Sequence, residues 1–192
     1  DHSVLSTGKN PAKDDYTITL ASNLKNITGI RLEALTHESF PKKSLARGNG
    51  NFVLTHFSVA QGKSPVKIAS ATSDYSQANY PVANALKPDA NTGWAGNGHL
   101  EAANRTAVFV FEKPVAGGDD NTLTITLKHQ SQYANHNIGH FRLSLTTAAE
   151  PKIRGGHSLP PVVAAALKSR PLNAMQHSKR RLPITTAASL RN

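Results

Sequence analysis

Apolar and polar residues alternate along five short segments of the chain. A period of two residues is typical of a β-strand that has one buried side and one solvent-facing side. The five segments are residues 16–20, 30–34, 53–57, 123–127 and 141–145. We therefore predict half-buried β-strands at these positions.

The rest of residues 1–148 supports an all-β reading. Residues 107–111 are continuously apolar, which predicts a strand covered on both sides. Turn-forming Gly, Pro, Asn and Asp residues separate the segments, and Val82–Leu86 fits a single helical turn. No long helical pattern is present in 1–148. We predict an antiparallel β-sandwich of the jelly-roll, galactose-binding-like kind, followed by a C-terminal tail with short helices.

The sequence contains a weak internal repeat. Thr-Ile-Thr-Leu occurs at 17–20 and again at 124–127, 107 residues further on, and each copy is followed by a second strand that contains Arg-Leu. These β units, about 1–62 and 66–148, each have an apolar face that they cannot cover alone. The repeat leaves two arrangements open: one shared sandwich, or the end of one sandwich followed by a second one.

The distribution of charge separates residues 149–192 from residues 1–148. The net charge of +10 arises mainly in residues 149–192, which hold eight Lys and Arg and one acidic residue, while residues 1–148 hold 14 Lys and Arg and 11 Asp and Glu. We interpret 149–192 as a basic linker leading to a further domain, because the chain resembles a piece cut from a longer protein. Polyanion binding through this tail is the alternative, and it would use Lys152, Arg154, Lys168, Arg170, Lys179, Arg180, Arg181 and Arg191.

The sequence lacks residues and motifs that several classes of function require. The chain has no cysteine, no GxSxG or HExxH motif and no apolar run long enough to span a membrane. The pairs Asp14-Asp15 and Asp119-Asp120 precede the same strand in the two repeat units, which favours a turn role over glycosidase chemistry. We therefore predict that the protein is not an enzyme, has no membrane span and does not bind nucleic acid.

Polar and aromatic residues gather in four loops. Flat rings suit the apolar face of a sugar, and amide, guanidinium and imidazole groups suit its hydroxyls. The candidate ligand-binding residues are Arg47, Asn49, Asn51, Tyr75, Gln77, Asn79, Tyr80, Asn97, His99, Tyr133 and His136. The alternative is that the tyrosines plug the end of the sandwich; we expect Trp94, the only tryptophan, to lie in the core.

Three segments resemble a known group of proteins. Residues 27–35, 47–54 and 138–144 look like a region of large planctomycete proteins that carry a cytochrome-c domain and planctomycete-specific domains of unknown function. That region is similar to galactose-binding jelly rolls of the discoidin kind. The resemblance covers about residues 1–185. It implies a non-catalytic, carbohydrate-binding-like module of an exported, periplasmic or secreted, multidomain protein.

The same resemblance suggests a metal. Residues 89–94 are similar to a loop that holds a structural calcium ion in discoidin-like modules, and this implies Asp89, Asn91 and Thr92 as oxygen ligands of Ca²⁺. Lys87-Pro88 stands where that loop has an Asp-Gly pair. The alternative is that Asp89 and Asn91 close a turn.

Three functions follow as hypotheses. The first is a module that attaches its parent protein to a polysaccharide or other glycan through loops at one end of the sandwich. The second is a structural domain that packs neighbouring domains of the parent chain together, and it predicts a sizeable apolar surface patch. The third is polyanion binding by the basic tail.

Overall fold

The computed structural model describes residues 2–117 and 122–153. These residues belong to one compact unit, Asp1–Arg154. The short helices predicted for the tail fall within 154–192, outside the described residues. No helix in the part of the chain that the structure describes is long and apolar enough to cross a membrane.

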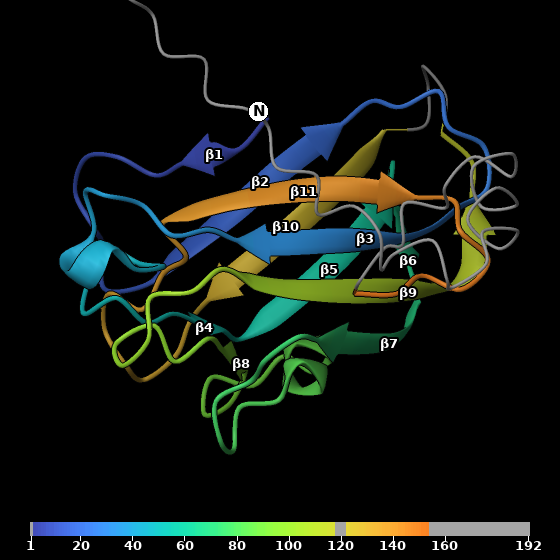
Figure 1. Ribbon diagram of the computed structural model, residues 1–192. Coiled ribbons are helices and arrows are strands. Elements are labelled where there is room, and N and C mark those ends of the chain that lie inside the picture. Colours follow the sequence, from blue (N-terminus) through green and yellow to red (C-terminus); the bar gives the residue numbers. More distant parts are fainter. Residues whose placement is uncertain (1, 118–121, 154–192) are drawn as a thin grey trace, which may run out of the picture. The chain divides into compact units, whose positions relative to one another are not determined.

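Two antiparallel sheets pack against each other, as the alternating segments predict, and form a β-sandwich (Figure 1). The larger sheet contains, in spatial order, β1 (Val4–Leu5), β11 (His140–Thr146), β3 (Ile27–Ala34), β9 (Arg105–Val115) and β7 (Ile68–Ser73). The smaller sheet contains β2 (Asp14–Leu20), β10 (Leu123–His129), β5 (His56–Gln61) and β6 (Ser64–Val66). Its strands run obliquely behind those of the larger sheet in Figure 1.

A short ladder and two 3₁₀ turns complete the described elements. They are β4 (Val53–Leu54) paired with β8 (Trp94–Ala95), η1 (Pro41–Lys43) and η2 (Val82–Leu86). The η2 turn has the bounds predicted from the sequence. The predicted strand at 53–57 is interrupted at Thr55, whose N–H and hydroxyl both donate to the Lys128 carbonyl, at 2.8 and 2.9 Å. This interruption lets β4 leave the smaller sheet and pair with β8.

The two repeat units share both sheets. In the smaller sheet the two Thr-Ile-Thr-Leu strands, β2 and β10, are antiparallel neighbours, and Ile18 lies opposite Ile125. In the larger sheet the two Arg-Leu strands, β3 and β11, are also neighbours, and Leu32 lies opposite Leu143. Each layer therefore contains one directly opposed pair of equivalent residues from the two units. The structure selects the single shared sandwich over the two-sandwich alternative.

Aromatic side chains join the two sheets across the core. Phe57 of β5 stacks on Phe109 of β9 with ring centroids 3.7 Å apart, and Tyr16 of β2 stacks on Phe141 of β11 at 5.6 Å. Both faces of β9 are covered near its start, where Ala107 to Phe109 are all buried, as the continuous apolar run predicts. Trp94 is fully buried and packs edge-to-face on Phe52, which confirms its core position.

Matching arginines of the two units meet one carboxylate. Arg142 binds Glu33 through two hydrogen bonds of 2.8 and 3.1 Å, whereas Arg31 approaches Glu33 only to 3.6 Å. The Arg142 hydrogen bond is the main reason that the pKa of Glu33 lies below its ordinary value. The arginines thus brace the outer face of the larger sheet.

Candidate functional site

A cavity lies at the loop end of the sandwich, where residues of four loops line it together with the β4–β8 ladder. Its volume is about 280 Å³. We call it the loop-end cavity, and it is lined by Asn49, Asn51, Val53, Gln77, Tyr80, Ala95, His99, Tyr133 and His136. The lining residues come from distant parts of the sequence, so only the fold brings them together.

Val53 and Ala95, a cross-strand pair of β4 and β8, contribute two buried residues to the cavity lining. Backbone hydrogen bonds attach the surrounding loops to this pair. The Val53 N–H donates to the His136 carbonyl at 2.9 Å, and the Ala95 N–H donates to the Tyr80 carbonyl at 3.3 Å. The Ala95 carbonyl accepts the Gln77 N–H at 2.9 Å. The β4–β8 pair therefore anchors the loops whose side chains line the rest of the cavity.

Gly98 allows two of the loops to approach closely. A Cβ at this position would lie 2.1 Å from the Gly50 carbonyl oxygen, so no other residue fits without a backbone shift. The Gly98 N–H donates to Asn51 Oδ1 at 3.0 Å, and its carbonyl accepts the Ser44 hydroxyl at 2.7 Å. This approach holds the buried Asn51 side chain beside the cavity.

Three rings form an aromatic wall. Tyr80 and Tyr133 lie with ring centroids 6.5 Å apart, and Tyr133 and His136 lie 5.5 Å apart. The Tyr80 hydroxyl donates to the Tyr133 hydroxyl at 3.4 Å, and this contact is the main reason that the pKa of Tyr80 is raised. Tyr133 is 45% exposed, so much of its side chain is open to a ligand.

Polar amides form another part of the lining. Asn51 Nδ2 donates to Gln77 Oε1 at 2.9 Å, and Asn49 Oδ1 accepts the backbone N–H of Asn51 at 2.9 Å. No Asp, Glu, Lys or Arg is among the described lining residues. The closest lysine contact to the lining is that of Lys42, whose Nζ donates to the His99 carbonyl at 2.6 Å. The loop-end cavity thus combines neutral amides with aromatic rings.

The structure brings together seven of the eleven residues predicted to bind a ligand. These are Asn49, Asn51, Gln77, Tyr80, His99, Tyr133 and His136. Their common sequence signal was the gathering of Asn, Gln, His and Tyr in loops. Val53 and Ala95 were not predicted as site residues. A small apolar residue in a strand carries no sequence signal that tells whether it lines a cavity or lies in the core.

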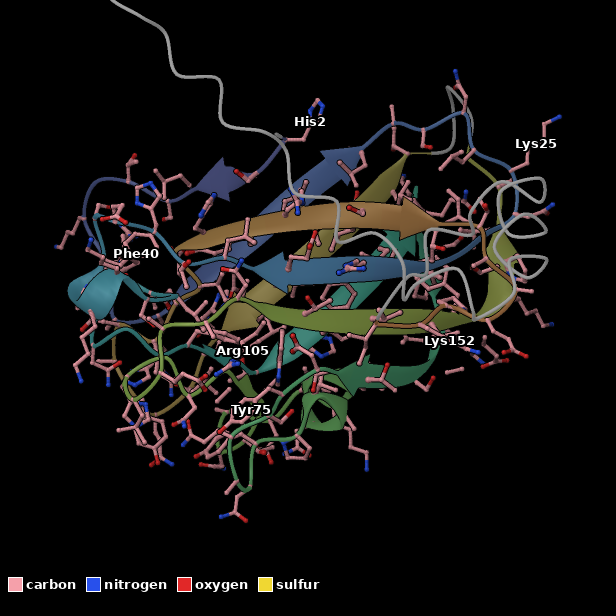
Figure 2. All side chains as sticks on the ribbon, in the orientation of Figure 1. His2, Lys25, Phe40, Tyr75, Arg105 and Lys152 are labelled. Atoms are coloured by element: carbon pink, nitrogen blue, oxygen red, sulfur yellow. The ribbon has the colours of Figure 1, made fainter. Side chains whose placement is uncertain are left out.

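The other four predicted residues do not line the loop-end cavity. The guanidinium of Arg105 lies over the Tyr75 ring, 4.2 Å from the ring centroid, and both residues are labelled in Figure 2. The Tyr75 hydroxyl accepts a hydrogen bond from Asn97 Nδ2 at 3.1 Å. Arg47 donates to the carbonyls of Thr7 and Gly8, at 3.0 and 2.8 Å.

Asn79 and Asn97 hold positive φ angles of 68° and 60° in the loops that border the cavity. Asparagine tolerates this left-handed conformation better than most residues do. With Tyr75 and Arg47, these residues shape the loops that carry the cavity residues.

The contacts at the predicted calcium loop fit a closed turn. Asp89 Oδ1 accepts the Asn91 N–H at 2.8 Å, and the Thr92 hydroxyl accepts Asn84 Nδ2 at 2.5 Å. Calcium takes six to eight oxygen ligands, and this loop supplies one carboxylate. Within the described residues no group of three or more His, Asp or Glu is placed to hold a metal ion. The contacts support the turn alternative, and calcium at this loop stays a prediction.

A second cavity lies between β6 and the end of β9. Its volume is about 310 Å³, slightly larger than that of the loop-end cavity. Lys67, Glu112 and Lys113 line it, together with Val66 and Val115 among others. No aromatic side chain is among its described lining residues. Size alone therefore favours this cavity, but side-chain chemistry favours the loop-end cavity as the candidate site.

Comparisons of the chain with protein-family models, with curated proteins and with solved structures found no match. The resemblance to planctomycete multidomain proteins therefore stays a prediction.

Proposed function

We propose that this protein is a non-catalytic module that binds a glycan in the loop-end cavity. The observation that carries the proposal is the convergence of seven polar and aromatic loop residues on one cavity. Side-chain chemistry alone, without any information on spatial proximity, predicts these same residues from the sequence. Unrelated surface residues from four loops would not be expected to share one cavity.

The chemistry of the lining supports a sugar as the ligand. The rings of Tyr80, Tyr133 and His136 offer flat faces for the C–H groups of a pyranose. Asn49 and Gln77 offer amide groups for its hydroxyls and ring oxygen. A glycosidase would need two carboxyl groups across the cleft, and none is among the described lining residues. Binding without catalysis is the function that fits.

The surface gives less support to a scaffold role. The exposed large apolar residues of the described chain are scattered over separate segments: Val4, Leu5, Leu24, Leu100 and Tyr133. A domain that packs several neighbours would be expected to show a contiguous apolar patch. The polyanion alternative depends mainly on residues outside the described part of the chain.

We further propose, from the resemblance, that the module is exported and attaches its parent protein to a polysaccharide. Calcium at 89–92 would be an additional structural element of that module. The proposals of export, polysaccharide attachment and calcium binding depend on the family resemblance, and the geometry of the cavity does not bear on them.

A glycan panel tests the proposed function. The full chain is screened against a broad range of sugars, in calcium and again in EDTA, at low and physiological ionic strength. We expect binding that persists at physiological salt, because it depends on rings and amides rather than on long-range charge. Absence of binding to any sugar would overturn the proposal, and loss in EDTA would support the calcium prediction.

Two tyrosine variants locate the binding. Tyr133→Ala removes the exposed ring from the aromatic wall, and we expect it to weaken glycan binding by about tenfold or more, since stacked rings supply much of such affinity. Tyr75→Phe is the control, because Tyr75 was predicted to bind but lies outside the lining. Equal losses in both variants would contradict binding in the loop-end cavity.

A further inference from the structure

The amide groups of the loop-end cavity have orientations that the backbone dictates. A backbone N–H can only donate, so the atom facing it must be an oxygen. The Gly98 N–H therefore identifies the Asn51 atom beside it as Oδ1, which leaves Nδ2 facing Gln77. Gln77 must meet that Nδ2 with Oε1, and its own Nε2 amide is left without a partner among the described residues.

The same reasoning orients Asn49. The Asn51 backbone N–H lies 2.9 Å from the Asn49 side chain, so the facing atom is Oδ1. Nδ2 of Asn49 then makes no hydrogen bond within the described part of the chain. Each of these two free amide nitrogens carries two N–H donors. The amide side of the cavity therefore offers both amide nitrogens as donors, while the amide oxygens of Asn49 and Gln77 each already accept one hydrogen bond.

The aromatic wall adds one further donor and two acceptors, the Tyr80 hydroxyl oxygen and one nitrogen of His136. The Tyr133 hydroxyl accepts from Tyr80, so its own O–H is free to donate. Nδ1 of His136 lies 3.0 Å from the Ala134 carbonyl, which can only accept. Nδ1 must therefore carry the proton, and Nε2 is the acceptor in the neutral ring. A protonated ring would turn this acceptor nitrogen into another donor.

We infer that the loop-end cavity recognises a sugar that bears a carboxylate, such as a uronic acid. This inference rests on the proposed function. The orientated side chains present several N–H and O–H donors that have no partner among the described residues, and a carboxylate has two oxygens that only accept. Hydrogen bonds to an ionised acceptor are roughly twice as strong as those between neutral groups. A neutral sugar, whose hydroxyls both donate and accept, would use the donors less fully.

The charges around the cavity agree with an anionic ligand. No carboxylate is among the described lining residues, so nothing in the lining repels the ligand. Lys42 is held with its ammonium on the His99 carbonyl, which places a positive charge next to a lining residue. Lys42 is not part of the described lining, so the neutral donors would make the direct contacts with a carboxylate.

A matched ligand series tests this inference on the full chain. Methyl glycosides of several uronic acids are each compared with the neutral hexose of the same configuration and with the uronate methyl ester. We expect at least one uronate to bind about tenfold or more tightly than both neutral counterparts. Equal or tighter binding of the neutral hexose would overturn the inference but leave the proposed function standing. If no sugar of either kind binds, the proposed function fails as well.

A charge-switch variant locates the effect. Gln77→Glu keeps the oxygen that accepts from Asn51 but replaces the free NH₂ donor with a charged oxygen. We expect an uronate to lose about tenfold or more in affinity, while a neutral sugar changes by less than about threefold. Gln132→Glu is the matched control, since it adds the same charge to the loop that carries Tyr133 and His136 but at a position outside the cavity lining. Uronate binding that survives Gln77→Glu would overturn the inference.

Discussion

The two repeat units contain the same Thr-Ile-Thr-Leu strand but give it different surroundings. In the second unit the strand is β10, which lies between β2 and β5, and its inward residues Leu123, Ile125 and Leu127 are all buried. In the first unit it is β2, at the edge of the sheet, where Ile18 and Leu20 are only half-buried. Identical local sequence thus gives equal strands and unequal burial, because burial depends on the neighbours.

The loops that follow these strands differ more than the strands do. After β10, residues 130–139 carry Tyr133 and His136 into the loop-end cavity. After β2, residues 21–26 are fewer and contribute nothing to its described lining. The symmetric strands therefore build the framework, and the asymmetric loops build the candidate site. Substitutions in one repeat unit can therefore be measured against substitutions in the other unit.

The largest effect on the free energy of unfolding is expected for the isoleucine pair at the centre of the smaller sheet. Ile125→Ala should lower the free energy of unfolding by about 3–4 kcal/mol, because the Ile125 side chain is fully buried and its truncation leaves a cavity in the core. Ile18→Ala, its direct cross-strand partner, should cost about 1 kcal/mol, because its side chain is half-exposed. Urea unfolding measures both losses. Equal losses would mean that the repeat units are energetically equivalent.

The second effect concerns His129, which ends β10 and is buried, with neither ring nitrogen hydrogen-bonded within the described residues. Burial lowers the pKa of His129 to about 4, although the neighbouring Asp14 backbone and, less strongly, the charge of Asp15 oppose this shift. The unfolded chain has a His pKa of about 6.5 and so binds the proton more readily. Stability should therefore fall as the pH drops from about 6.5 to about 4, by up to about 3 kcal/mol in total.

His129→Leu isolates this contribution. The difference in unfolding free energy between the variant and the unaltered protein should change with pH only in this window. Unfolding titrations at several pH values measure it. If the two proteins lose stability in parallel on acidification, His129 does not contribute to acid sensitivity.

A smaller effect is expected from the matching arginines of the two units. Arg142→Met removes two hydrogen bonds to Glu33, one of them 2.8 Å long, and should cost about 0.5–1 kcal/mol at low salt. Arg31→Met should cost less than about 0.5 kcal/mol, because Arg31 stands 3.6 Å from Glu33 and its buried Nε is unpartnered among the described residues. Thermal unfolding at two salt concentrations compares them, and a larger loss for Arg31→Met would reverse the assignment.

The smallest effect on stability is expected in the loops, where the effect on binding is largest. Tyr133 and Leu24 follow the two repeat strands and have nearly equal exposure, 45% and 44%. Alanine at either position should change the free energy of unfolding by less than about 0.5 kcal/mol. Only Tyr133→Ala should weaken glycan binding. A binding loss in Leu24→Ala would place the ligand elsewhere on the molecule.

Local pattern predicted most of the strands correctly, and the reason is burial. Period-two alternation records which side of a strand faces the core, so the segments of β2, β3, β10 and β11 were recognisable, as was the doubly covered start of β9. The single predicted strand at 53–57 was wrong in one respect, its interruption at Thr55. That break depends on hydrogen bonds to Lys128, which is more than seventy residues away.

The sequence by itself determined the β class, the repeat and the chemistry available in the loops, because each is carried by residue type and local spacing. Only the tertiary structure decided that both units share one sandwich, since this follows from long-range strand pairing. It also decided which polar residues line the loop-end cavity and which, like Tyr75 and Arg47, support the loops. Hydrogen-bond direction in the cavity depends on Gly98 meeting Asn51 across 47 residues, a contact that no local pattern contains.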